Sequence, residues 1–112
     1  MRNSRPLQLC RRTAAVVLAL SAALATAVAA PGDSARGGKL AKQWCASCHI
    51  VSSDQSRGAD FAPTFASIAK RPGFTANYTA QFLTRSHPRM PDVHLTRDEA
   101  RDLGAYIASL AH

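Results

Sequence analysis

Three observations on this chain of 112 residues predict an all-α fold. Near the C-terminus, apolar residues recur at the i, i+3, i+4, i+7 spacing of one helix face, at Leu103, Tyr106, Ile107 and Leu110. Side chains that can cap a helix stand before the apolar segments. No stretch alternates apolar and polar residues as a half-buried strand would.

Residues 1–29 have the features of a cleaved secretory signal peptide. Four arginines in the first 12 residues precede 17 uncharged residues, Ala14 to Ala30, of which nine are alanine. Ala27-Val28-Ala29 offers a peptidase site, and Cys10 would leave with the signal. The alternative is an uncleaved membrane anchor, because the run approaches the ~17 residues that span a bilayer. Its alanine content makes it weakly hydrophobic, so we expect export to the periplasm without stable membrane insertion.

The remaining domain, residues 30–112, has a modest charge. Four of the 14 Lys and Arg belong to the signal, which leaves ten against seven Asp and Glu, a net charge of +3. No basic stripe with interleaved aromatic residues appears in it. Most of the basic character therefore disappears with the signal, and we expect no nucleic-acid partner.

The first helix of this domain is expected to have Asp33 or Ser34 as its cap and to run as far as Trp44. Gly37 and Gly38 each cost about 1 kcal/mol relative to alanine inside a helix. Close approach of another helix would explain them, and an ordinary amphipathic helix with a frayed start is the alternative. One face carries Gly37, Leu40, Ala41 and Trp44.

The middle of the chain is expected to hold two short helices. Residues 50–62 form a polar loop, and Pro63 to Lys70 can form the first short helix. Arg71-Pro72-Gly73 then breaks the chain, and Thr75 can cap a second helix that ends at about Arg85. Apolar contacts are expected from Phe61, Phe65, Ile68, Tyr78, Phe82 and Leu83.

The last helix has the strongest local signal. Thr96-Arg97-Asp98-Glu99 is a capping-box sequence, in which the cap and the third helical residue bond to each other's backbone. Gly104 and Ala108 flank its apolar face with small side chains, which would suit a crossing against Gly37. We therefore expect the first and last helices to pack on each other.

Cys45-Ala46-Ser47-Cys48-His49 is the motif that carries chemistry. Two cysteines separated by two residues and followed at once by histidine form the attachment site of a c-type haem. The thiols can add to the two vinyl groups, and His49 can then bind the iron. A redox dithiol and a zinc site are the alternatives. The zinc site would need further ligands, and residues 30–112 contain only two cysteines.

Met90 is the candidate for the second iron ligand. A six-coordinate electron-transfer haem needs a ligand opposite the histidine, usually a methionine sulfur or a second imidazole. Met90 is the only methionine outside the signal, and Pro88 and Pro91 stiffen the segment around it. His87 and His94 are its competitors. His112, at the terminus, is expected on the surface.

Together these residues resemble a class I, single-haem cytochrome c of the small bacterial kind. The resemblance rests on the haem motif, Met90-Pro91, Pro63 and the final helix, and it covers essentially all of residues 30–112. It implies three to five helices around one covalent haem c. It also implies contact between Gly37 and Tyr106 where the terminal helices cross, and a hydrogen bond from His49 to the carbonyl of Pro63. Where the family often has an aromatic residue, this chain has Ala41, and Trp44 is expected to compensate in part.

The function that this resemblance implies is one-electron transfer between periplasmic redox proteins by Fe(III)/Fe(II) cycling, without independent enzyme activity. The alternatives are a haem subunit of a fixed oxidoreductase complex and a ligand-binding or sensory protein in which Met90 is labile. A monomer or a weakly associated protein is expected. Four cations flank the haem-bearing segments and can steer an acidic partner, unless they form an ordinary solvated surface. They are Lys39, Lys42, Arg85 and Arg89.

Overall fold

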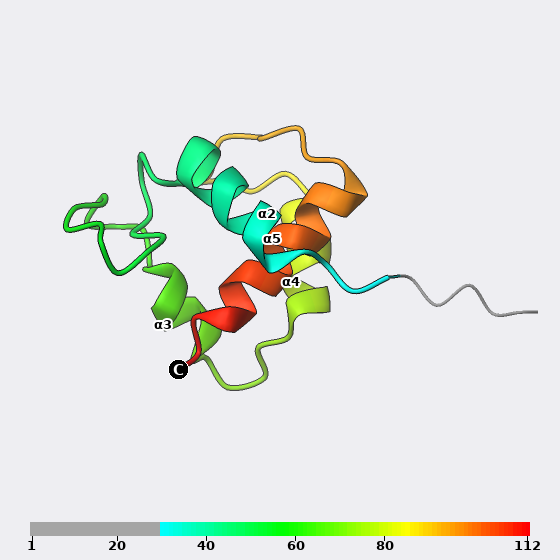
Figure 1. Cartoon of the computed structure of the whole chain (residues 1–112). Coiled ribbons are helices and arrows are strands. Elements are labelled where there is room, and N and C mark those ends of the chain that lie inside the picture. The colour runs from blue at the N-terminus through cyan, green and yellow to red at the C-terminus, as the bar shows by residue number, and fades with distance from the viewer. Residues whose placement is uncertain (1–29) are drawn as a thin grey trace, which may run out of the picture.

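The computed structural model describes residues 30–112 and shows a helical domain (Figure 1). The predicted signal, residues 1–29, lies outside the described residues. The elements are α2 (Ser34–Leu40), the π-helical segment η1 (Ala41–Cys45), α3 (Phe65–Ala69), α4 (Ala76–Leu83) and α5 (Arg97–Ser109). Over this part of the chain the only β-type pairing is an isolated bridge between His87 and Met90. The prediction of an all-α fold is confirmed.

Each α-helix starts where a side chain satisfies a free backbone N–H of its first turn. Asp33, rather than Ser34, caps α2, while Thr64 caps α3 and Thr75 caps α4. Thr96 caps α5 through the predicted capping box, in which the Glu99 carboxylate accepts from the Thr96 N–H at 2.8 Å. Three of these caps, Asp33, Thr75 and Thr96, were predicted from the sequence, whereas Thr64 was not.

Helices α2 and α5 cross closely, and Gly37 makes this possible (Figure 1). A Cβ at Gly37 would lie 2.8 Å from the Cβ of Tyr106 and would also overlap the Asp102 carbonyl. Only a residue without a side chain fits there. The expected crossing of the terminal helices, with Gly37 and Tyr106 at the contact, is confirmed.

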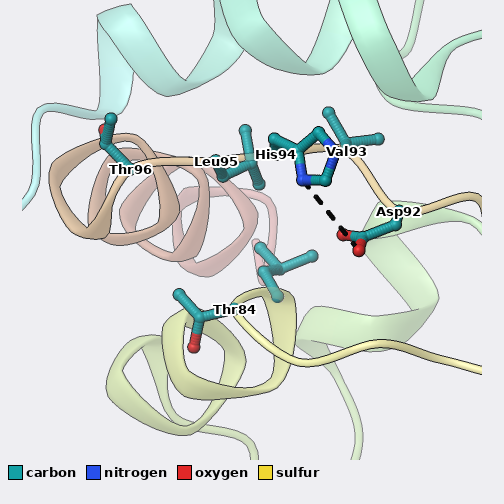
Figure 2. A pocket seen from close by; sticks show the side chains of 7 residues that line it. Thr84, Asp92, Val93, His94, Leu95 and Thr96 are labelled. Atoms are coloured by element: carbon teal, nitrogen blue, oxygen red, sulfur yellow. Dashed lines mark ion pairs between the residues drawn. The ribbon is translucent and has the colours of Figure 1, made fainter.

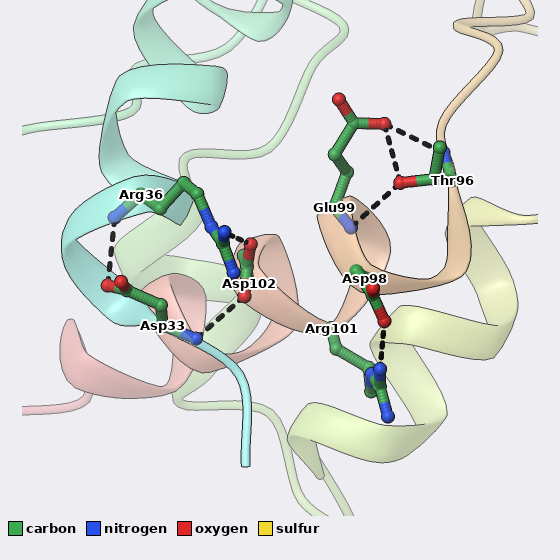
Figure 3. A network of polar contacts seen from close by, with 7 residues as sticks. All are labelled: Asp33, Arg36, Thr96, Asp98, Glu99, Arg101 and Asp102. Atoms are coloured by element: carbon green, nitrogen blue, oxygen red, sulfur yellow. Dashed lines mark hydrogen bonds and ion pairs between the residues drawn. The ribbon is translucent and has the colours of Figure 1, made fainter. Parts of the chain in front are cut away.

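A buried carboxylate fastens the same crossing. Asp102 in α5 is 2% exposed and accepts hydrogen bonds from the Asp33 N–H at 2.7 Å and from Arg36 Nε at 2.6 Å (Figure 3). Burial opposes ionisation of Asp102, but these two hydrogen bonds and the positive charges of Arg36 and Arg101 together outweigh it and hold its pKa below the ordinary value. The start of α2 is thereby tied to the middle of α5.

Gly104 serves another contact than the one predicted. A Cβ there would lie 3.2 Å from the carbonyl carbon of Ala76, the first residue of α4. Two residues along a helix turn the chain by about 200°, so Gly104 points away from the side on which Asp102 meets Gly37. The interpretation of Gly104 as part of the α2–α5 crossing is wrong; it lets α4 approach α5.

Trp44 also departs from expectation, because the helix widens at η1, which begins three residues before Trp44. In η1 the Ala46 N–H donates to the Ala41 carbonyl five residues back, at 3.1 Å. Each residue then turns by less than the ~100° of an α-helix, so Trp44 leaves the face that Ala41 shares with the core. Ala41 is fully buried, whereas Trp44 is 50% exposed. The expectation that Trp44 compensates at the crossing is wrong.

The core lies between the first helix, α3 and α5. Its buried members are Ala41, Val51, Phe65, Ala69, Leu103 and Ile107. Within residues 30–112, no helix is long and apolar enough to cross a membrane.

Candidate functional site

One side of the domain is hollowed by a cavity of about 690 Å³. Its volume falls within the range of roughly 300–1,000 Å³ that ligand cavities have. Four large aromatic side chains line it without being buried by the protein: Trp44, Phe61, Tyr78 and Phe82 are 50%, 71%, 65% and 45% exposed. Such a concentration of exposed aromatic surface around one cavity calls for a large apolar group inside it.

Two segments of the cavity lining carry the predicted site residues. We call residues 45–65 the His49 wall and residues 84–95 the Met90 loop. Cys45, Cys48, His49 and Pro63 line the cavity from the first segment, and Met90 lines it from the second. The structure therefore brings all five predicted cofactor-binding residues to one cavity.

The two thiols stand where η1 ends in a tight turn. The N–H groups of Cys48 and His49 both donate to the Cys45 carbonyl, at 3.2 and 2.9 Å. Cys45 and Cys48 are not joined by a disulfide, and burial raises the pKa of the Cys45 thiol to about 11. A reactive redox dithiol needs the opposite, a lowered thiol pKa. Among the described residues, no group of three or more His, Cys, Asp and Glu side chains is placed to hold a metal ion.

The imidazole of His49 is held by a hydrogen bond from its Nδ1 atom. Nδ1 lies 2.7 Å from the carbonyl oxygen of Pro63, the hydrogen bond that the resemblance implies. A carbonyl can only accept, so Nδ1 carries the proton and Nε2 of the neutral ring is left with a free lone pair. The ring also packs against Phe65, with centroids 5.3 Å apart. This tautomer is the one that a metal-binding histidine needs.

Met90 sits in a tight turn between two prolines. Its N–H donates to the His87 carbonyl at 3.4 Å, which closes the isolated bridge. His87 lines the cavity as well, with its ring centroid 3.7 Å from that of Phe82. Its Nε2 is buried and has no hydrogen-bond partner. His87 is therefore the competitor of Met90 that the cavity retains.

His94 does not line this cavity. It lies in a neighbouring hollow of about 290 Å³, where its Nδ1 approaches the Asp92 carboxylate at 4.0 Å (Figure 2). Its side chain is 93% exposed. His112 is also exposed at the terminus. Of the three histidines other than His49, only His87 can face a group in the cavity.

The predicted steering cations divide into two pairs. Arg85 and Arg89 line the cavity, whereas Lys39 and Lys42 do not. Lys42 lies 3.8 Å from the Asp54 carboxylate, on the exposed surface. Positive charge at the cavity itself therefore comes from arginine.

The donor set fits a c-type haem. Two thiols at the end of a helical segment, an imidazole with a free Nε2, a thioether and an apolar lining all meet at one cavity. The unpartnered Nε2 of His87 is an additional polar atom left for a bound group.

Gln55 is the residue of this site that the sequence interpretation missed. Its side chain bonds to the backbone at four places in the His49 wall. A single glutamine in a polar loop has no local signal of such a role, because the contacts depend on how the loop folds back.

Comparison with known proteins gives two matches. The family model for cytochrome c matches residues 34–111. A cytochrome c-552 from Bradyrhizobium diazoefficiens is 46% identical to this chain over 95 residues, which are 85% of this chain and 89% of that protein. No solved structure gives a significant match.

Proposed function

Because this chain belongs to the cytochrome c family and is a single-haem electron carrier, we propose a specific ligand set for its covalent haem c. Cys45 and Cys48 would form the thioether bonds to the haem, His49 and Met90 would bind its iron, and Pro63 would orient His49. The observation that carries this proposal is the convergence of all five residues on one cavity. No match and no described residue favours either alternative function.

The bound haem supplies a one-electron Fe(III)/Fe(II) couple. The protein's part is to keep both ligands in place and to exclude water, so that little rearranges when the charge changes. The Pro63 carbonyl keeps the proton on His49 Nδ1, at 2.7 Å, and so keeps Nε2 available. Thioether ligation by Met90 and an apolar lining both favour Fe(II), so a relatively high reduction potential is expected.

Met90 is preferred over His87 for two reasons. Pro88 and Pro91 restrict the backbone on both sides of Met90. The His87 ring is already engaged with Phe82 at 3.7 Å. His87 is therefore proposed to face the cavity without binding iron.

The test compares Met90→Ala with His87→Ala in the haem-loaded protein. Met90→Ala is expected to abolish the sulfur-to-iron charge-transfer band of the oxidised protein and to lower the potential, because the thioether is lost. His87→Ala is expected to keep the band. An unchanged spectrum in Met90→Ala, or a bis-imidazole potential in the wild type, would rule out Met90 as the ligand.

We also propose that the chain is exported and cleaved after Ala29, and that residues 30–112 act in the periplasm as a carrier rather than as an enzyme. The support is the arginine-rich start followed by 17 uncharged residues. Mass spectrometry of the periplasmic protein should give the mass of residues 30–112 plus one haem. A mass that includes residues 1–29 would favour the uncleaved anchor instead.

A further inference from the structure

Gln55 lies at the centre of the hydrogen bonds that hold the His49 wall. Its Oε1 accepts from the Val51 N–H at 3.0 Å. Its Nε2 faces three carbonyl oxygens, those of Ala46 and His49 at 2.9 Å each and that of Arg57 at 2.7 Å. The reversed amide would place an oxygen against three oxygens, so the orientation is unambiguous. The amide has two N–H groups for three acceptors, so one N–H is shared between two carbonyl oxygens.

Two of these acceptors belong to the turn that presents the haem-binding side chains. Ala46 is the C-cap of η1, so its carbonyl has no partner inside the helix. The His49 carbonyl ends the same turn. A carbonyl that is withdrawn from water without a partner is costly, and Gln55 gives both of these part-buried carbonyls a donor. One side chain thus ties together the two ends of the segment that contains Cys48 and His49.

Other parts of the chain hold the carbonyls on either side of His49. The Ala59 N–H donates to Cys48 O at 2.7 Å, and the Phe65 N–H donates to Ile50 O at 2.9 Å. Gln55 supplies the bond that completes this row, at His49 O itself. The backbone of the ligand is therefore held at His49 and at both neighbours.

We infer that Gln55 is a positioning residue for the proximal histidine. It holds the His49 backbone from one side, while Pro63 holds the ring at Nδ1 from the other. Two anchors on different parts of the residue fix the ring plane, which one anchor would leave free to rotate. This inference rests on the proposed role of His49 as an iron ligand.

Removing the Gln55 side chain would free the carbonyls of Ala46 and His49, and water would have to hydrate them. More polar surroundings of the iron stabilise the more highly charged Fe(III) state. The expected result is a lower reduction potential together with a changed orientation of the His49 ring.

The experiment compares Gln55→Ala with Gln81→Ala in the haem-loaded full chain. Gln81 is exposed on α4 and does not line the cavity, so it is a matched control. Voltammetry should show a lower midpoint potential for Gln55→Ala alone. Proton NMR of the oxidised protein should show shifted haem methyl resonances, which report the plane of the axial imidazole, while the sulfur-to-iron band is kept.

A second variant, Gln55→Glu, keeps the size of the side chain and the acceptor for Val51 but loses the N–H donors. A methyl pattern shifted in both variants supports positioning, since the glutamate leaves no cavity and its added charge alone can lower the potential. Wild-type potentials and methyl patterns in both, with only a lower unfolding temperature, would overturn it. If the wild type itself lacks the sulfur-to-iron band, the Met90 proposal fails, and the methyl pattern still tests Gln55.

Discussion

The His49 wall and the Met90 loop line the same cavity but are held in different ways. Carbonyls from Cys48 to Val51 each accept a hydrogen bond of 2.7 to 2.9 Å from elsewhere in the domain. In the Met90 loop, the Arg85 N–H donates to the Phe82 carbonyl at 3.2 Å at the end of α4. Over residues 86–95 the one backbone hydrogen bond comes from the Met90 N–H, and it is long at 3.4 Å. His49, one proposed ligand, lies in a hydrogen-bond network, whereas Met90, the other proposed ligand, lies in a loop with little such support.

The difference indicates how far each region keeps its conformation without the cofactor. The His49 wall has internal partners for its backbone, so the protein alone specifies it. The Met90 loop depends on two prolines and on whatever fills the cavity beside it. Segments with few buried contacts open at low free-energy cost. We therefore expect Met90, rather than His49, to leave the iron first when the protein is stressed.

The largest expected effect comes from removing the group between the two regions. With Cys45→Ala and Cys48→Ala together the haem is no longer held covalently. Loss of the haem would leave an apolar cavity of about 690 Å³ open to water. A typical domain is only about 5–15 kcal/mol stable, so this small domain is expected to lose most of its stability. Circular dichroism should show a chain without a cooperative thermal transition.

The matched control for the double cysteine variant is Ser47→Ala, whose exposed side chain lies between the two thiols. It is expected to keep the haem and the wild-type transition. A haem-free double variant that still unfolds cooperatively at the wild-type temperature would contradict the view that the cofactor forms much of the core.

The next largest effect tests the contact between α5 and the His49 wall. The Tyr106 hydroxyl in α5 donates to the Val51 carbonyl at 2.8 Å. Tyr106→Phe removes this bond and should lower the free energy of unfolding by about 1 kcal/mol. Tyr78→Phe is the control, because that side chain is 65% exposed at the cavity. Denaturant titration of both variants gives the comparison, and equal losses would show that the wall gains nothing from α5.

The smallest effect concerns the Met90 loop. Pro88→Ala gives the backbone next to Met90 more freedom in the open state, worth about 0.4–1 kcal/mol. Added imidazole should then displace Met90 from the oxidised iron about two- to fivefold more readily. Optical titration measures this, with Pro31→Ala, outside the cavity lining, as the control. An unchanged affinity of the iron for imidazole would mean that the Met90 loop is as firmly held as the His49 wall.

Local chemistry predicted much of the fold. Caps such as Thr75 and Thr96 and the apolar periodicity of the last helix depend only on neighbouring residues, so the sequence alone predicts these helices. The assignment of Gly104 was wrong because a small residue shows that something approaches, but not which helix. Trp44 was misplaced because nothing in the local sequence announces the π-helical turn before it.

The residues of the candidate site also divide into those that local sequence predicts and those that it does not. Cys45, Cys48 and His49 form a contiguous motif whose spacing carries its chemistry, and Met90 is the proposed second ligand because residues 30–112 hold no other methionine. Gln55 could not be found in this manner. Its role comes from a loop that folds back on the motif, and this path is set by bonds between residues that are distant in sequence.

The π-helical segment η1 sets a constraint on length. Its extra residue stands between Gly37, which fits α2 against α5, and Cys45, which faces the cavity. Deleting one residue between them, for example Lys42, would turn the thiols by about 100° around the helix axis if Gly37 stayed in place. The number of residues between Gly37 and Cys45 therefore sets the direction in which the thiols point. Single-residue insertions or deletions there should be far less tolerated than substitutions.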